Sequence, residues 1–308
     1  MCIRDSAERA SLPLLPAEPG DLFHVLYARR GRLAKTRARE HNPLTDASGY
    51  LRIREDGRMA ETRNAELDLA LAAELQAALL PSACPHDCPH QRAAARNRMY
   101  AGVGGDFYDF IRFNDEQVVI LIGDVVGHGV RASLLMAQIM GYLRTPPPSI
   151  AHPAKLISSL NEMLLDMGQK VGSVLPCTLF YAVLDLPTGA TFYVNAGHPA
   201  PFLCDCTKCI VLPIGPRNLM LGVQPFAPEE GCHTFAPQER MVLYTDGVTD
   251  AVNEAGELFG ATRLHEVINR TAESTPQEVA DAVFDAVDAF RGQARQNDDE
   301  TVCVIDRI

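Results

Sequence analysis

Residues 117–129 read QVVILIGDVVGHG, and this stretch decides the fold prediction. Its first part is a near-continuous apolar run, which is typical of a β-strand buried on both faces. Asp124 and a glycine-rich turn follow directly, so we expect an acidic side chain at the rim of a sheet. Further strands are predicted on both sides of it, at 98–103, 106–113, 177–186, 190–197, 201–205, 209–213, 232–236, 240–246 and 301–308.

The predicted helices come in pairs rather than in strict alternation with the strands. One pair covers 130–143 and 153–167, separated by the breaker TPPPS, and the other lies near 261–270 and 276–290. Clustered strands with paired helices favour an α+β layered domain over a doubly wound sheet.

A helix is predicted over 64–80, where Asn64 can cap and Pro81 stops the pattern. Leucines recur along it at helical spacing, which makes it amphipathic. The leucine stripe either packs on the following domain or pairs with a second copy, and four leucines are too few for a coiled coil, so we expect packing on the domain. The stripe consists of Leu67, Leu71, Leu75 and Leu79.

Composition limits the classes of function. The chain has 308 residues, a formal net charge of -11 and 47% hydrophobic residues, which is typical of a soluble globular protein. The negative charge disfavours nucleic acid, and no apolar run is long enough to span a bilayer. We therefore expect a cytoplasmic protein with no nucleic-acid partner and no membrane span.

Acidic residues recur at the ends of predicted strands, in GVGGDFYDF, GDVVGHG, LYTDGVTD and NDDETVCVI. Clustered carboxylates repel one another unless cations neutralise them, and oxygen ligands without histidine at metal-ligand spacing favour Mg²⁺ or Mn²⁺. Gly105 and Gly247 would let backbone approach ions or phosphate. Ordinary turn chemistry explains any one of these motifs, but not all four together. The acidic residues are Asp106, Asp124, Asp246, Asp298 and Asp299.

Two cysteine clusters have spacings that resemble half-sites for structural zinc. The alternative is that these cysteines are small apolar fillers. The candidate zinc ligands are Cys84, Cys88, Cys204, Cys206 and Cys209.

The order of the motifs resembles the protein phosphatase 2C-like superfamily, and within it the SpoIIE/RsbU-type serine phosphatases. The resemblance runs from AAELQAALLP (72–81) through GGDFYDF, GDVVGHG, NAGHPAP, LGV, LYTDGVTDA and NDDETVCVI. It implies an α-β-β-α sandwich, in which two central, mostly antiparallel β-sheets are flanked by helices. It also implies a centre of two Mn²⁺ or Mg²⁺ ions at one end.

The resemblance implies roles for individual residues. Asp124 would bridge the metals and the Val125 carbonyl would complete one site. Asp246 and Asp298 would be further ligands, and Asp106 would hold a metal directly or a water beside one. Asp299 is a second candidate in the last motif.

Two histidines lie in motif turns. His128 is a candidate general acid, but it follows Asp124 by four residues, whereas the histidine of animal-type enzymes follows its aspartate by two. A structural role is equally open for it. His198 is expected to be a hydrogen-bonding loop residue.

The implied reaction is hydrolysis of phosphoserine or phosphothreonine without a covalent intermediate. The implied substrate is a phosphorylated anti-sigma-factor antagonist with a STAS domain. Residues 1–63 would be a leader or truncated regulatory segment, 64–81 a switch helix that serves an upstream regulator or a homodimer, and 82–308 the phosphatase domain. The alternative is a catalytically inactive module that binds a phosphorylated partner.

Overall fold

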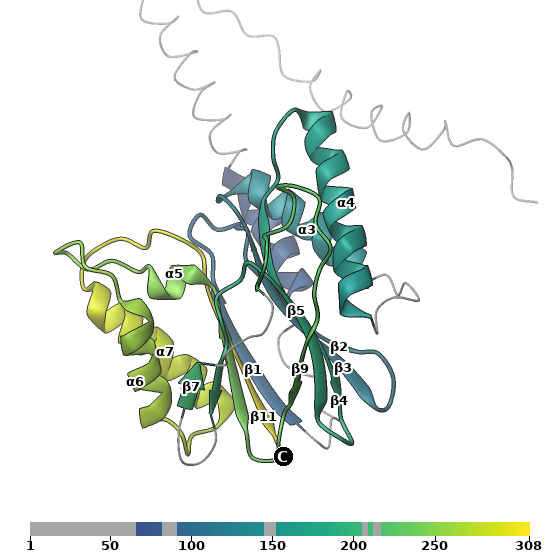
Figure 1. Ribbon diagram of the computed structural model, residues 1–308. Helices are drawn as coiled ribbons and strands as arrows, with labels where there is room; N and C mark the ends of the chain where they lie inside the picture. Colours follow the sequence, from purple (N-terminus) through teal and green to yellow (C-terminus); the bar gives the residue numbers. More distant parts are fainter. Residues whose placement is uncertain (1–65, 82–90, 145–151, 205–208, 212–216) are drawn as a thin grey trace, which may run out of the picture. The chain divides into compact units, whose positions relative to one another are not determined.

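Two β-sheets lie face to face at the centre of the computed structural model (Figure 1). The structure describes residues 66–81, 91–144, 152–204, 209–211 and 217–308.

The first sheet has five strands, and every pair in it is antiparallel. Its centre is formed by the two apolar segments near the C-terminus of the chain. In spatial order the strands are β1 (Gln91–Arg98), β11 (Glu300–Arg307), β10 (Arg240–Tyr244), β6 (Phe202–Cys204) and β7 (Cys209–Val211).

The second sheet has six strands and is antiparallel except where β5 meets β8. Its spatial order is β2 (Phe107–Arg112), β3 (Gln117–Val125), β4 (Cys177–Asp185), β5 (Ala190–Ala196) and β8 (Arg217–Asn218), with β9 (Gly231–Thr234) paired to β5.

A pair of helices covers the outer face of each sheet (Figure 1). The second sheet carries α3 (Val130–Arg144) and α4 (Pro153–Val171), while the first carries α6 (Gly260–Arg270) and α7 (Pro276–Arg291). A single short turn of helix, α5 (Asp246–Thr249), follows β10. The predicted α-β-β-α sandwich is therefore confirmed. A capping box between Thr275 and Glu278 starts α7.

Three apolar layers hold the sandwich together. β3 shows how they meet, because Val119 and Leu121 face the α3–α4 layer while Ile120 and Ile122 face the layer between the sheets. A third layer lies between α6, α7 and the first sheet. A strand buried on both faces needs apolar side chains at every position, which is why QVVILIG lacks polar alternation.

The first predicted strand was placed wrongly. The strand is Gln91–Arg98, and residues 99–106 form an irregular loop instead. The segment QRAAARNR lacks β-branched and aromatic residues, so propensity gives no strand signal there, and pairing with β11 overrides it. The loop carries three glycines, which suit a path through non-strand backbone.

The helix at 66–79 packs through a different face from the predicted one. Leu67, Leu71 and Leu75 are 59%, 49% and 72% exposed, so the expectation that the leucine stripe packs on the domain was wrong. Gln76 is buried instead, and its side-chain amide donates to the Gly104 carbonyl (2.8 Å) and accepts from the Gly104 N–H (3.0 Å). A side-chain amide can satisfy both backbone groups of a loop residue, which a leucine cannot do.

None of the helices in the described ranges combines the length and hydropathy needed to cross a bilayer.

Candidate metal centre

The predicted carboxylates come from the same end of both sheets. Asp124 lies near the end of β3, and Asp106 directly precedes β2, whose first residue Phe107 pairs with Gly123. On the other sheet, Asp246 follows β10, and Asp298 and Asp299 precede β11. Because β10 and β11 are antiparallel neighbours, the end of one and the start of the other meet at one edge.

The carboxylates are close enough to perturb one another. Burial raises the pKa of Asp106 well above its usual range, and the charge of Asp124 raises it further. Burial also raises the pKa of Asp124 to about 7, with contributions from Asp246, Asp298 and Asp299. The pKa of Asp246 is raised by burial and then by Asp298. All five predicted aspartates therefore belong to one electrostatic cluster.

Two threonines that the sequence analysis missed hold Asp106. Thr245 and Thr301 both donate their hydroxyls to Oδ2 of Asp106, at 2.8 and 2.6 Å, and all three side chains are buried. The Thr301 N–H donates to the Thr245 hydroxyl at 2.9 Å, which ties the two strand ends together. The signal was available, since each threonine adjoins the acidic residues of its motif, in YTDG and DDET.

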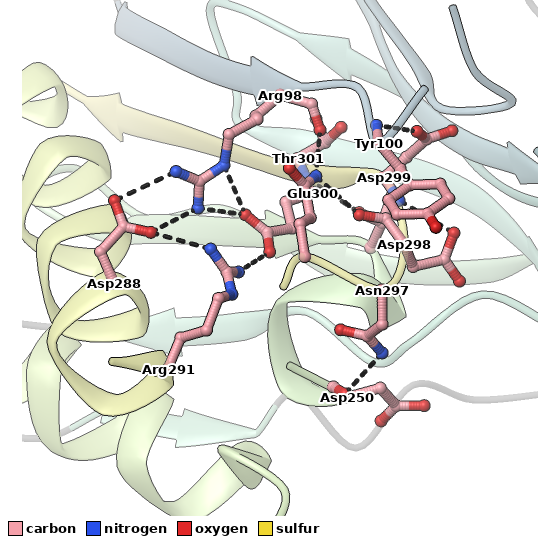
Figure 2. Close-up of polar contacts among 12 residues, drawn as sticks. Arg98, Tyr100, Asp250, Asp288, Arg291, Asn297, Asp298, Asp299, Glu300 and Thr301 are labelled. Atoms are coloured by element: carbon pink, nitrogen blue, oxygen red, sulfur yellow. Dashed lines mark hydrogen bonds and ion pairs between the residues drawn. The ribbon is translucent and has the colours of Figure 1, made fainter. Parts of the chain in front are cut away.

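The two aspartates of DDET have different partners (Figure 2). Asp299 accepts hydrogen bonds from the backbone N–H groups of Tyr100 and Gly105, both at 2.7 Å, so it fixes the loop before β2. The Asp298 carboxylate accepts only the neighbouring Asp299 N–H (2.8 Å) among the described residues, and its charge acts on Asp246 and Asp124. Of the two candidates, the geometry therefore favours Asp298 as the metal ligand.

The glycines of the centre allow backbone segments to meet. A Cβ on Gly104 would collide with the Asp299 carboxylate, and one on Gly247 would collide with the Asp299 carbonyl. A Cβ on Gly105 would collide with the Val125 carbonyl and lie 3.0 Å from the Asp124 carboxylate. Gly105 therefore faces both oxygen donors predicted on the GDVV turn, while Gly104 and Gly247 serve close packing around Asp299.

The donor set fits a hard divalent cation in its chemistry. Asp124, Asp246, Asp298 and the Val125 carbonyl supply only oxygen, the donor that Mg²⁺ and Mn²⁺ prefer. Within the described ranges, no three His, Cys, Asp or Glu side chains stand close enough together to hold an ion without side-chain movement. Without a cation, carboxylates repel one another and stay apart. The residues therefore fit the ions by the type of their donor atoms and by their position at the same end of the sheets.

An ionic network fixes the start of β11 behind the centre (Figure 2). The buried Glu300 accepts from Arg98 Nε at 2.9 Å and from Arg291. Asp288 accepts from both arginines, at 2.7–3.0 Å. Removing one member of a buried ionic network is costly, so the network holds the backbone that carries Asp298 and Asp299. No sequence motif pointed to it, because its members lie on three separate elements.

The remaining predicted site residues are His128 and the cysteines. His128 has no contact with the carboxylates among the described residues, and most of the cysteine side chains lie outside the described part of the chain. His128 is exposed on its turn, with its ring edge-on to Tyr100 at 5.3 Å between centroids. Its role as an acid stays a prediction. For zinc, Cys204 is disulfide-bonded, so it offers no free thiolate. The other candidate side chains lie outside the described residues, and zinc gains no support; they are Cys84, Cys88, Cys206 and Cys209.

His198 is buried in the turn after β5, as a loop hydrogen-bonder should be. Its Nδ1 bonds the Thr178 hydroxyl at 3.0 Å, its N–H donates to Asn195 Oδ1 at 2.8 Å, and its carbonyl accepts from Asn195 Nδ2 at 3.0 Å. Burial lowers its pKa from 6.5 to about 3, against an opposing contribution from the Tyr244 backbone.

We expect this histidine to make stability fall with acidity. Below pH 6.5 His198 becomes protonated in the unfolded chain but stays neutral in the folded protein. The free energy of unfolding therefore decreases as pH falls from 6.5 toward 3. Between pH 6.5 and 5 the loss is about 2 kcal/mol. Urea titrations across this range should show the wild type losing that amount relative to His198→Gln, since every other titrating group, including the acidic cluster, contributes equally to both proteins. Parallel profiles would contradict this assignment.

A known protein family and its members match the part of the chain that carries most of these motifs. The model of the family described as Stage II sporulation protein E (SpoIIE) matches residues 114–308. Phosphoserine phosphatase RsbU of Bacillus subtilis (strain 168) is 27% identical over 206 residues, which cover 67% of this chain and 60% of RsbU. The chain therefore spans less than two thirds of the length of this relative.

Solved structures share the fold. The SiaA-PP2C domain of Pseudomonas aeruginosa superposes with a TM-score of 0.68 at 20% identity, covering 81% of this chain and 99% of that domain. A structure of RsbX in complex with magnesium has a TM-score of 0.53 at 12% identity, covering 72% of this chain and 98% of RsbX. Since the family model spans well over half of the residues, including the motifs of Asp124, Asp246 and Asp298, this chain belongs to the SpoIIE family.

Proposed function

We propose that the chain is a metal-dependent protein serine/threonine phosphatase. The observation that carries this proposal is the gathering of Asp106, Asp124, Asp246 and Asp298 at one end of both sheets, where burial and the charges of Asp246 and Asp298 raise the pKa of Asp124, and burial and the charge of Asp124 raise that of Asp106. Family membership supports it, because the similar RsbU carries the name phosphoserine phosphatase. A structural domain gains nothing from mutually repelling acids, which argues against the inactive binding module as the alternative.

In this proposal different residues would hold the metal ions and orient the water. Asp124 and the Val125 carbonyl would hold ions on the β3 side, and Asp246 and Asp298 would hold them on the β10–β11 side. Asp106, fixed by Thr245 and Thr301, would orient a water or be a ligand itself. When bound, two Mn²⁺ or Mg²⁺ ions would supply an acidified water and screen the charge of the phosphoryl oxygens.

The substrate we propose is a phosphorylated STAS-domain anti-sigma-factor antagonist in partner switching. Residues 82–308 would form the catalytic domain, 64–81 a switch helix and 1–63 a regulatory segment. Gln76 gives the switch a physical basis, because it bonds Gly104, whose neighbour Gly105 faces Val125 and Asp124.

The test is phosphate release from a panel of phosphorylated STAS-domain proteins of the same genome, with Mn²⁺ and with chelator. We expect Mn²⁺-dependent release from at least one member. Turnover of p-nitrophenyl phosphate in Mn²⁺ with no release from any STAS protein would keep the phosphatase and reject this substrate class. Tight binding of a phosphorylated STAS protein without turnover of either compound would favour the inactive module.

A further inference from the structure

Five apolar side chains lie exposed around the start of α3 and the end of α4. We call this set the apolar patch, and each member is more than half exposed. Exposed apolar side chains that gather on one surface mark interaction sites more often than isolated ones do. The patch consists of Val126, Val130, Leu134, Val171 and Val174.

Hydrogen bonds between their neighbours place these residues on one surface. Arg131 at the start of α3 donates to Ser173 Oγ (3.0 Å), just beyond the end of α4, and Gln138 contacts Met163 further along both helices. The two helices therefore run antiparallel, with the start of α3 beside the end of α4. The Val126 N–H donates to the Pro176 carbonyl (3.0 Å), which joins the turn after β3 to the same surface.

The apolar patch continues into the candidate metal centre. Val126 follows Asp124 by two residues, and the intervening Val125 N–H donates to Gly105 at 3.3 Å. A folded protein whose phosphoserine reached Asp124 would therefore lie against Val126 and its neighbours. A small phosphate ester would reach the same carboxylates without touching α3 or α4.

The patch also carries a charge that complements a phosphorylated partner. Arg131 is exposed between Val130 and Leu134, and among the residues that the structure describes it forms no ion pair and bonds only the neutral Ser173. Such a cation, in a chain of net charge -11, suits an acidic side chain on the surface of a protein partner.

We propose that the apolar patch and Arg131 dock the folded phosphoprotein substrate of this protein. This inference rests on the proposed phosphatase function and adds the surface that selects proteins over small esters. Apolar anchors around one charged group are typical of a transient protein interface.

The test compares kcat/KM for p-nitrophenyl phosphate and for a phosphorylated STAS-domain protein, using the full chain with Mn²⁺. We expect Leu134→Ser and Arg131→Ala each to lower kcat/KM for the phosphoprotein about tenfold or more, mainly through KM. Turnover of p-nitrophenyl phosphate should stay within about twofold, because among the described residues Arg131 bonds Ser173 and none of the aspartates of the centre, and Leu134 is apolar. The matched control is Phe192→Ser, an exposed apolar residue toward the far end of β5.

The outcomes test the phosphatase function and the docking surface separately. No turnover of p-nitrophenyl phosphate by the wild type would reject the phosphatase function itself. Retained turnover of that ester with no preference for the phosphoprotein, or equal losses in Leu134→Ser and Phe192→Ser, would overturn the docking surface alone. A wild-type dimer that Leu134→Ser converts to a monomer would assign the patch to a second copy and would also overturn it.

Discussion

Asp124→Asn is expected to abolish Mn²⁺-dependent phosphatase activity while making the metal-free protein more stable. The loss of activity should be about a thousandfold or more, because Asp124 would hold the metal ions that supply most of the chemistry. In chelator the same substitution removes a carboxylate whose pKa is raised to about 7 by burial and by Asp246, Asp298 and Asp299. We expect the free energy of unfolding to rise by about 1–2 kcal/mol at pH 8.

The pH dependence of this gain tests its cause. The unfolded aspartate loses its proton near pH 4, whereas the folded one keeps it until about pH 7, so the wild type loses stability as pH rises across that window. The advantage of Asp124→Asn should therefore grow between pH 4 and 7 and level off above. Urea titrations in chelator measure it, with Asp285→Asn, an exposed aspartate of α7, as the matched control. An Asp124→Asn protein that is less stable at pH 8, or fully active, would contradict the account.

The adjacent pair Asp298→Asn and Asp299→Asn should separate metal binding from loop anchoring. Asp298→Asn keeps an oxygen for the Asp299 N–H, so we expect unchanged or greater stability in chelator and at least about a hundredfold loss of activity. Asp299→Asn turns an amide nitrogen toward the Tyr100 or Gly105 N–H. We expect it to cost about 2 kcal/mol of stability, because one buried N–H then lacks an acceptor.

The response to added Mn²⁺ distinguishes the two variants further. A missing ligand raises the concentration of Mn²⁺ needed for half-maximal activity, and Asp298→Asn should show that rise. Asp299→Asn should instead show a lowered midpoint of urea unfolding. The reverse assignment, with the stability loss in Asp298→Asn and the Mn²⁺ shift in Asp299→Asn, would make Asp299 the ligand.

Sequence patterns predicted the layers of this fold because its strands and helices carry strong local signals. QVVILIG has the unbroken apolar run of a strand buried twice, and the helix pairs show clear periodicity and punctuation. The strand at Gln91–Arg98 was not predicted because its residues have low strand propensity and only the pairing with β11 makes it a strand. The leucine stripe at 66–79 was misplaced because periodicity shows which residues share a face, and not which face is covered.

The candidate site was predictable as a set of residue types and much less so as a set of partners. Strand-end aspartates are visible in the motifs, and the structure brings them into one electrostatic cluster. Their supports, such as Thr301 on Asp106 and Arg98 on Glu300, join residues that lie about 200 positions apart in the chain, with separations of 195 and 202. The register of β1 on β11 brings Arg98 to Glu300, and the packing of one sheet on the other brings Thr301 to Asp106, so local sequence could not assign distinct roles to Asp298 and Asp299.

If the clustered aspartates form a metal centre that hydrolyses phosphate esters, turnover must depend on added metal. Steady-state turnover of p-nitrophenyl phosphate by the full chain, titrated with Mn²⁺ after removal of metal by chelator, tests it most directly. We expect negligible turnover in chelator, saturable recovery with Mn²⁺, and no recovery in Asp124→Asn or Asp246→Asn. Full turnover in chelator, or a phosphorylated form of the protein trapped during turnover, would contradict it.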